Sequence, residues 1–422
     1  MIQWRDAGIA LYPDTKALDI DGCWSGSACM DVDGVPVLFY TAGNNQELPN
    51  QSVAIARPEN PEDAELKSWK KEGIVLRQKI GQGFLGEFRD PFVWKRGDCF
   101  YMLVGTGDAE NGGGNALLYT SGDLKNFKCH GFVVDYDYDI SNEVGHIWEL
   151  PVLLPLHDEN GKYCCDILLF CACQVENDVV ENYYFIGKFD YENGKFQKYH
   201  ELPRLLDVGN GIFTGPSGFV TPDGRSVLFT IAQGKRKPQE EYDAGWAHNG
   251  GMPIALGLKN GVLRVEPIGE IRRYFPKSVL EEEVRAENFG KAVLCGENLL
   301  ENRMLILTKG EALELIWEGK EDTYTISYNR TTREWKALSE KAGGMISKIR
   351  GEEDLVDIGN EEIEIECYVD HSVIEMYLNG RKSMTLRGYS LCKSSNFYVR
   401  MNGAGHISVW EYDEKEGQGE RE

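Results

Sequence analysis

Two acidic residues stand in contexts that favour a chemical role. Glu149 lies inside the otherwise apolar run "HIWELPVLLP" (146–155), and Asp90 lies between an arginine and a proline in "EFRDP" (87–91). An ionised carboxylate left unpaired in an apolar environment costs several kcal/mol, so burial is expected to raise the pKa of Glu149. The guanidinium of Arg89 is expected to help keep Asp90 ionised. A protonated acid beside an ionised one is the pairing that general acid–base catalysis uses.

Each acid also has a structural alternative. Asp90 fits a turn aspartate that precedes a proline, and Glu149 fits one partner of a buried ion pair. Taken singly, the chemical and structural interpretations have about equal support. The chemical interpretation gains weight because both acids fall at the same phase of an internal repeat.

The repeat consists of a tight turn followed by an apolar strand. It occurs four times, as "DGVPVLFYTAG", "RGDCFYMLVGTG", "NGKYCCDILLFCA" and "DGRSVLFTIAQG". The turn glycines Gly34, Gly97, Gly161 and Gly224 are spaced by 63, 64 and 63 residues. Asn-Gly and Asp-Gly are hairpin-turn signals, and further strands follow each repeat. About four short strands per unit predict one blade of a β-propeller.

The candidate functional stretches precede the turn glycines at one phase of the repeat. They are "CWSGS" (23–27), "EFRDP" (87–91), "WELP" (148–151) and "IFTGP" (212–216). In a propeller this phase corresponds to the innermost strand of each blade, beside the central axis. Residues far apart in the sequence are therefore expected to converge on one pocket at the hub.

The repeat predicts a two-domain, all-β protein. We assign 1–272 to a propeller with four recognisable blades, 273–288 to a helical or irregular linker, 289–413 to a β-sandwich and 414–422 to a disordered tail. The sandwich is predicted by many short strands with polar turns and almost no helix signal. The loop "GTGDAENGGGN" lacks the Gly-Lys-Ser/Thr ending of a phosphate-binding loop and sits between strands.

Composition limits the partners. A net charge of −23 disfavours nucleic acids and anionic membranes and suits a neutral substrate. The N-terminus interrupts any signal-peptide pattern with Arg5, Asp6 and Pro13, so a cytoplasmic location is expected. The 11 cysteines contain no Cys-x-x-Cys pair and fit reduced, packed thiols rather than a metal site or a disulfide framework.

The ordered set of motifs resembles glycoside hydrolase family 32, the β-fructosidases (invertases, levanases, inulinases and sucrose-6-phosphate hydrolases). "ALYPD…GCWSGSA" resembles the family's segment ending in Ser-Gly-Ser, "FRDP" its Arg-Asp-Pro motif, and "WELP" its Glu-Cys motif. "GWAHNGGMP" resembles its late tryptophan-bearing strand, and "YVDHSVIEMYLNG" a strand pair of its sandwich. The resemblance covers nearly the whole chain.

This resemblance implies a five-bladed propeller followed by a β-sandwich, and retaining hydrolysis of terminal fructosyl units without a metal or an organic cofactor. Glu149 would be the general acid/base, and Asp90 would stabilise the transition state by gripping sugar hydroxyls. The fructose pocket would be shaped by Arg89, Trp24, Ser25 and Trp246.

Two features depart from the family's pattern. Leu150 follows the acid/base glutamate where the family usually has cysteine, which affects the tuning of the acid. The nucleophile segment Trp-x-Asn-Asp-Pro-Asn-Gly of the first blade is absent from this sequence. Nearby carboxylates, Asp6, Asp14, Asp19 and Asp21, lack the motif, so none receives the role. We therefore expect the first blade to be missing.

Three interpretations follow. The first is a β-fructosidase whose first blade is missing from this chain. The second is a fructan- or sugar-binding pseudoenzyme that kept the pocket without the nucleophile. The third, a relative from a neighbouring five-bladed family that acts on arabinosides, is disfavoured by the sandwich motif. The preferred fructoside (sucrose, its 6-phosphate, inulin or levan) stays open, and an exposed sheet edge would favour a homo-oligomer.

Overall fold

The computed structural model describes residues 3–14, 19–44, 48–139, 143–175, 180–209, 211–287, 289, 292–297, 301–320, 322–339, 344–348, 358–389 and 395–413. The predicted tail at 414–422 lies outside these residues. Within them, no helix has both the length and the apolar character needed to cross a membrane.

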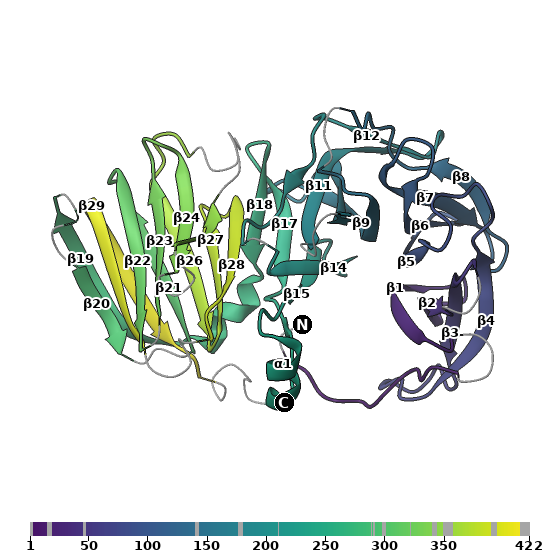
Figure 1. The fold of residues 1–422 in the computed structure, drawn as a ribbon, viewed down its shortest axis with the longest axis horizontal. Helices are drawn as coiled ribbons and strands as arrows, with labels where there is room; N and C mark the ends of the chain where they lie inside the picture. Colours follow the sequence, from purple (N-terminus) through teal and green to yellow (C-terminus); the bar gives the residue numbers. More distant parts are fainter. Residues whose placement is uncertain are drawn as a thin grey trace.

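Four antiparallel sheets surround the hub of the N-terminal domain, as predicted (Figure 1). The first contains β1 (Gly22–Met30), β2 (Pro36–Gly43), β3 (Gln51–Pro58) and β4 (Trp69–Arg77). The second contains β5 (Arg89–Arg96), β6 (Cys99–Asp108), β7 (Gly113–Ser121) and β8 (Lys128–Phe132). The third contains β9 (Ile147–His157), β10 (Tyr163–Cys173), β11 (Val180–Asp190), β12 (Lys195–Lys198) and β13 (Arg204–Leu205). The fourth contains β14 (Phe213–Val220), β15 (Ser226–Ala232), β16 (Asn249–Gly250), β17 (Ile254–Lys259) and β18 (Val262–Pro267), with helix α1 (Pro238–Ala244) between β15 and β16.

The turn glycines set this repeat. Gly34, Gly97, Gly161 and Gly224 each adopt a positive φ, between 59° and 87°, in the turn that joins the first and second strands of a blade. Glycine reaches this left-handed region without a steric penalty. The strand before each of these turns is the first of its blade, and these four strands, β1, β5, β9 and β14, pack in order around the hub. They carry the four candidate stretches, which confirms the phase predicted from the sequence.

The row of blades is open between the fourth and the first. Packing joins β1 to β5, β5 to β9 and β9 to β14, and no comparable packing joins β14 to β1 among the described residues. The extended segment 3–14 runs across this side of the domain (Figure 1). Leu11 packs against the first blade at Tyr40, and the Trp4 ring lies 5.7 Å from the ring of Phe229 on the fourth blade.

The C-terminal domain is an 11-stranded antiparallel sheet that curls on itself. Its strands are β19 (Lys277–Ala286), β20 (Ala292–Glu297), β21 (Glu301–Thr308), β22 (Ala312–Gly319), β23 (Thr323–Asn329), β24 (Glu334–Ser339), β25 (Gly344–Lys348), β26 (Ile363–Asp370), β27 (Val373–Leu378), β28 (Lys382–Arg387) and β29 (Ser395–Glu411). The long strand β29 joins the two halves, because its first part pairs with β22 and β20 and its second part with β21 and β19. One hydrophobic cluster continues from the propeller into this domain.

The prediction that 273–288 is a helical or irregular linker is wrong for most of its length, because most of it is a strand. The short 3-10 helix η1 (Gly269–Tyr274) ends there, and Lys277–Ala286 forms strand β19, paired along its length with β29. The segment is polar and rich in glutamate because much of this edge strand is exposed, and such a pattern does not predict a strand.

Candidate active site

The innermost strands share a β-bulge at the candidate motifs. Pairing shifts register between Arg89 and Phe92 on β5, near Glu149 on β9, and between Thr214 and Ser217 on β14. The residue before each proline adopts a positive φ: 59° at Asp90, 50° at Leu150 and 63° at Gly215. A bulge bends a strand and redirects its side chains. Strained backbone at non-glycine residues commonly marks functional sites.

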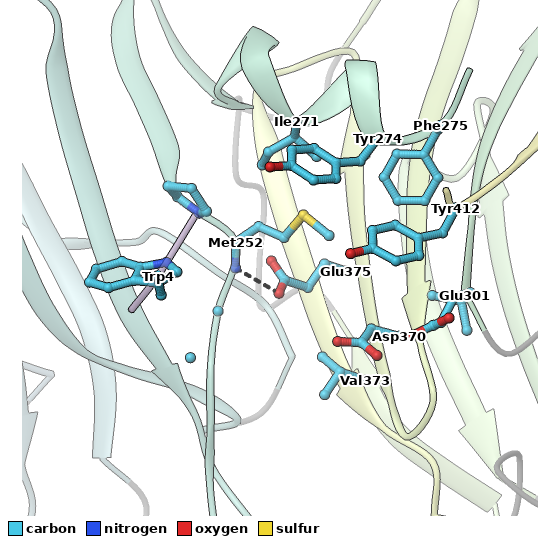
Figure 2. A pocket seen from close by; sticks show the side chains of 14 residues that line it. Trp4, Met252, Ile271, Tyr274, Phe275, Glu301, Asp370, Val373, Glu375 and Tyr412 are labelled. Atoms are coloured by element: carbon cyan, nitrogen blue, oxygen red, sulfur yellow. Dashed lines mark hydrogen bonds between the residues drawn. The ribbon is translucent and has the colours of Figure 1, made fainter. Parts of the chain in front are cut away.

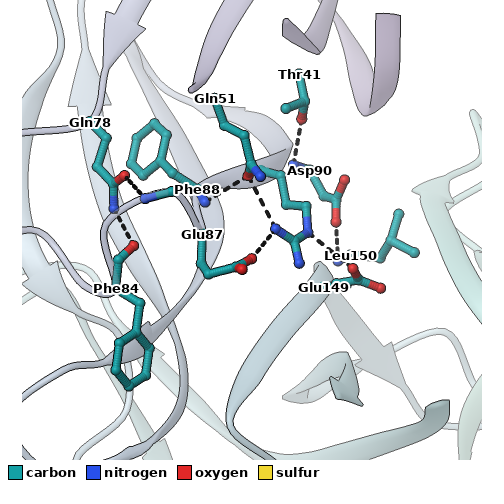
Figure 3. A network of polar contacts seen from close by, with 11 residues as sticks. Thr41, Gln51, Gln78, Phe84, Glu87, Phe88, Asp90, Glu149 and Leu150 are labelled. Carbon is teal, nitrogen blue, oxygen red and sulfur yellow. Dashed lines mark hydrogen bonds and ion pairs between the residues drawn. The ribbon is translucent and has the colours of Figure 1, made fainter. Parts of the chain in front are cut away.

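Arg89 orients one of the two candidate acids, Glu149, within the network of polar contacts drawn in Figure 3. Its Nε donates to Glu149 Oε1 at 3.0 Å, and its Nη1 donates to Gln51 Oε1 at 3.1 Å and also pairs with Glu87. The guanidinium therefore lies between the second and third blades and fixes the direction of the Glu149 carboxylate.

Asp90 is held from two other strands. Its carboxylate Oδ2 accepts the backbone N–H of Leu150 at 3.0 Å, and its own backbone N–H donates to Thr41 Oγ1 at 2.8 Å. Burial raises the pKa of Asp90 to about 6, against the hydrogen bond from Leu150 and the charge of Arg89. Arg89 thus acts in the predicted direction, and burial outweighs it. At pH 7 an acid with this pKa is still mainly ionised.

Glu149 departs from the sequence prediction. Its side chain is 31% exposed and paired with Arg89, so the premise that apolar neighbours bury it is wrong. Trp148 and Val152 are buried, but the bulge at Leu150 lets Glu149 face the site rather than the core. The ion pair with Arg89 agrees with the structural alternative and is also compatible with a role for the carboxylate in proton transfer.

The predicted pocket residues occupy different places. The Trp24 ring lies against Gly22 and Gly43, where a Cβ atom would come within 2.4 and 2.5 Å of the indole. Ser25 is exposed, and its carbonyl accepts the Thr41 hydroxyl at 3.0 Å, which links it to the residue that holds Asp90. Their contacts with a sugar stay predictions.

Trp246 contacts residues of the fourth blade and of the C-terminal domain. Its ring lies 4.1 Å from the Arg236 guanidinium and 6.2 Å from the ring of Tyr389, which belongs to the C-terminal domain. These contacts do not include Asp90 or Glu149. A role for Trp246 in the sugar pocket is not supported by them and stays a prediction.

Several residues of the site escaped sequence reasoning. Thr41 and Gln51 lie at strand ends of the first blade and hold Asp90 and Arg89. Cys171 lies directly opposite Glu149 in the β9–β10 register, with its thiol 3.4 Å from Thr214 Oγ1. The signal for Cys171 in the sequence is its position on the strand that follows "WELP" after the turn at Gly161, a position that also fits a cysteine packed in the core.

The residues around Asp90 and Glu149 do not include the group with metal-ligand spacing that the structure contains. Among the described residues, one group has spacing suited to a metal ion, the exposed trio Glu301, Asp370 and His371, and it lies in the C-terminal domain.

Comparisons with known families match both domains. Residues 1–267 match the family described as "Glycosyl hydrolases family 32 N-terminal domain", and residues 304–411 match the family described as "Glycosyl hydrolases family 32 C terminal". A sucrose-6-phosphate hydrolase of Salmonella typhimurium is 31% identical over 276 residues, which cover 64% of this chain and 56% of that protein. A fructan 1-exohydrolase of Bromus pictus is 29% identical, covering 61% of this chain and 43% of that protein. The chain thus spans about half the length of these relatives.

Solved structures show the same fold. The sucrose-6-phosphate hydrolase of Lactobacillus gasseri superposes with a TM-score of 0.75 at 21% identity, covering 95% of this chain and 80% of that one. Fructan 1-exohydrolase IIa of Cichorium intybus superposes with a TM-score of 0.74 at 19% identity, covering 96% and 86%. Because the family descriptions account for most of its length, the chain belongs to glycosyl hydrolase family 32.

Proposed function

We propose that this protein is a β-fructosidase that hydrolyses a terminal β-fructofuranosyl unit from a small fructoside such as sucrose or its 6-phosphate, with retention of configuration. The observation that carries the proposal is the junction of β5 and β9, where Arg89 binds Glu149 and Leu150 binds Asp90. The named activities of the relatives, on sucrose 6-phosphate and fructans, support the substrate class.

In this proposal the two acids have separate roles. Glu149, partly exposed and oriented by Arg89, protonates the leaving oxygen and then activates water. Asp90 accepts hydrogen bonds from sugar hydroxyls while positive charge develops at the ring. Its backbone and its carboxylate are both held, so little reorganisation is required when substrate binds. The nucleophile is not assigned to any residue of this sequence.

A second candidate is a sugar-binding relative without turnover. The ion pair of Glu149 with Arg89 favours it, because it agrees with a structural role for that carboxylate. Both candidates use Asp90 as a sugar ligand, so binding alone does not separate them.

The test measures release of reducing sugar from sucrose, sucrose 6-phosphate and a short fructan by the chain extended at its N-terminus with a blade that carries Trp-x-Asn-Asp-Pro-Asn-Gly, and by the same extended chain with Glu149→Gln. Release that Glu149→Gln abolishes, with a β-fructose product seen first by NMR, supports the enzyme. Fructose binding that Asp90→Asn removes, without release, supports the second candidate. Glu192→Gln, in the exposed turn after β11, is the matched control. Release insensitive to Glu149→Gln would contradict the site.

A further inference from the structure

A pocket lies where the fourth blade meets the C-terminal domain (Figure 2). Its volume is about 290 Å³, near the lower end of small-ligand sites. The backbone of Gly250 to Pro253 forms one wall, η1 and the residues after it form a second, and strands β26 and β27 form a third. Trp4 of the extended N-terminal segment stands at its edge. The pocket is separate from the Asp90–Glu149 site and does not depend on the proposed function.

The charge of this pocket is one-sided. Its lining contains three carboxylates, Glu301, Asp370 and Glu375, and no lysine or arginine. Asp370 has a basic neighbour outside the pocket, because His371 Nδ1 lies 2.8 Å from its Oδ1. A ligand that carries a phosphate would be repelled here.

Glu375 is the acid with the greatest need for a counter-charge. It is 4% exposed, and its two oxygens accept neutral donors, the Met252 N–H at 2.9 Å and the Tyr377 hydroxyl at 3.0 Å. Burial raises the pKa of Glu375 to about 7, and the negative charges of Asp207 and Asp370 act in the same direction. Each oxygen keeps a further lone pair for a ligand.

A second, independent feature is the hydroxyl of Tyr274. This side chain lines the pocket and is 7% exposed, yet its hydroxyl is buried without a hydrogen-bond partner. Its ring stacks on Tyr412 with the centroids 5.9 Å apart and the planes 8° from parallel. An unpaired buried hydroxyl costs free energy that a bound donor would recover.

We propose that this pocket binds a small primary ammonium ion, with the charged nitrogen facing Glu375 and the Tyr274 hydroxyl. An ammonium group supplies the missing positive charge and donates three hydrogen bonds, and the rings of Trp4 and Tyr412 line the same pocket. A divalent metal fits less well, because calcium or magnesium requires about six oxygen ligands. A neutral sugar would leave Glu375 without compensation.

The experiment is isothermal titration calorimetry of the 422-residue chain near pH 8, where Glu375 is mainly ionised. The probes are n-butylammonium chloride, its neutral counterpart 1-butanol, and fructose. We expect saturable binding of butylammonium only. Glu375→Gln should weaken it roughly tenfold or more, because hydrogen bonds to charged groups are the stronger ones. Tyr274→Phe should weaken it by a smaller factor, and Glu192→Gln should leave it unchanged.

Equal binding of 1-butanol would overturn the proposal, since it would mean that only the apolar walls bind. Absence of saturable heat with butylammonium at tens of millimolar would also overturn it. So would an unchanged affinity in Glu375→Gln that unfolds cooperatively at the wild-type temperature. If Glu375→Gln does not fold, Tyr274→Phe decides, because it retains the stacked ring and removes only the oxygen.

Discussion

Asp90 at the propeller hub and Glu366 in the C-terminal domain are acids of equal burial, with 6% and 4% of their surface exposed. Glu366 accepts from Arg272 at 2.8 and 3.1 Å, from Arg303 Nε at 2.6 Å and from the Tyr368 hydroxyl at 2.8 Å. Burial alone would raise its pKa, but the two arginines lower it. Asp90 has one backbone donor, and its pKa is raised.

The difference separates an acid that stabilises the fold from one that is available to a ligand. Glu366 has its charge neutralised and connects η1 to β21 and β26, so its hydrogen-bonding capacity is used within the protein. Asp90 keeps lone pairs and a charge that the protein does not satisfy, on a left-handed backbone. A buried acid with a raised pKa and few donors is a candidate ligand-binding group.

The largest effect is expected from adding a candidate nucleophile to the hub. We predict that extending the chain at its N-terminus with a blade that carries Trp-x-Asn-Asp-Pro-Asn-Gly raises release of reducing sugar from sucrose by several orders of magnitude. Loss of a nucleophile costs factors of this size in other hydrolases. The control is the same extension with the motif's aspartate replaced by alanine. Robust turnover by the 422-residue chain itself would show that another carboxylate already serves as nucleophile, with Asp21 the first to test.

The neutralised acid should matter most for stability. Glu366→Ala is expected to lower the free energy of unfolding by about 3–5 kcal/mol, because it leaves the buried guanidinium of Arg303 without its partner. Urea denaturation measures the loss, and Glu192→Ala serves as the exposed control. A loss under about 1 kcal/mol, the value typical of surface pairs, would mean that water compensates the arginines.

Local rules explain what could be predicted of the fold. The turn at Gly34 and its three equivalents is specified by Asn-Gly, Asp-Gly and related pairs a few residues long, so four blades and their inner strands follow from the sequence. Strand β19 could not be predicted, because its pairing partner β29 lies more than a hundred residues away and its own pattern is polar.

The candidate site likewise has features that the sequence predicts and features that depend on the folded structure. The motifs located Asp90 and Glu149, and their meeting follows from the common phase of the repeat. The exposure of Glu149 depends on the bulge at Leu150, and the pKa of Asp90 depends on burial by neighbouring blades, so neither could be derived from adjacent residues. Thr41 carries no motif that distinguishes it from any strand threonine.

Removing the unsatisfied charge should stabilise the protein. The pKa of Asp90 rises from 3.8 to about 6, a shift of about two units, which corresponds to about 3 kcal/mol at most. Because the pKa of Asp90 is higher in the folded state than in the unfolded state, ionisation of Asp90 lowers the free energy of unfolding as pH rises from about 4 through 6. Asp90→Asn should therefore unfold at a higher temperature than wild type near pH 7.5 and at a similar temperature near pH 4.

Thermal unfolding at the two pH values measures this effect, and loss of fructose binding should accompany it. A uniform shift at both pH values would attribute the change to packing rather than charge. Glu192→Gln, whose carboxylate is exposed, is the control and should show no pH-dependent gain.

The smallest effect concerns the backbone of Asp90 rather than its charge. Thr41 is fully buried; its hydroxyl donates to the Ser25 carbonyl at 3.0 Å and accepts the Asp90 N–H at 2.8 Å. Thr41→Val keeps the shape and leaves both backbone groups unpaired, so we expect a loss of about 1–2 kcal/mol in urea denaturation. Thr41→Ser keeps the hydroxyl and should lose less. Because Thr41 holds the backbone and not the carboxylate, combining Thr41→Val with Asp90→Asn should give effects that add to within about 0.5 kcal/mol. A larger coupling would mean that the position of the Asp90 carboxylate depends on the first blade, and the hub would then respond as one unit to any change at that blade.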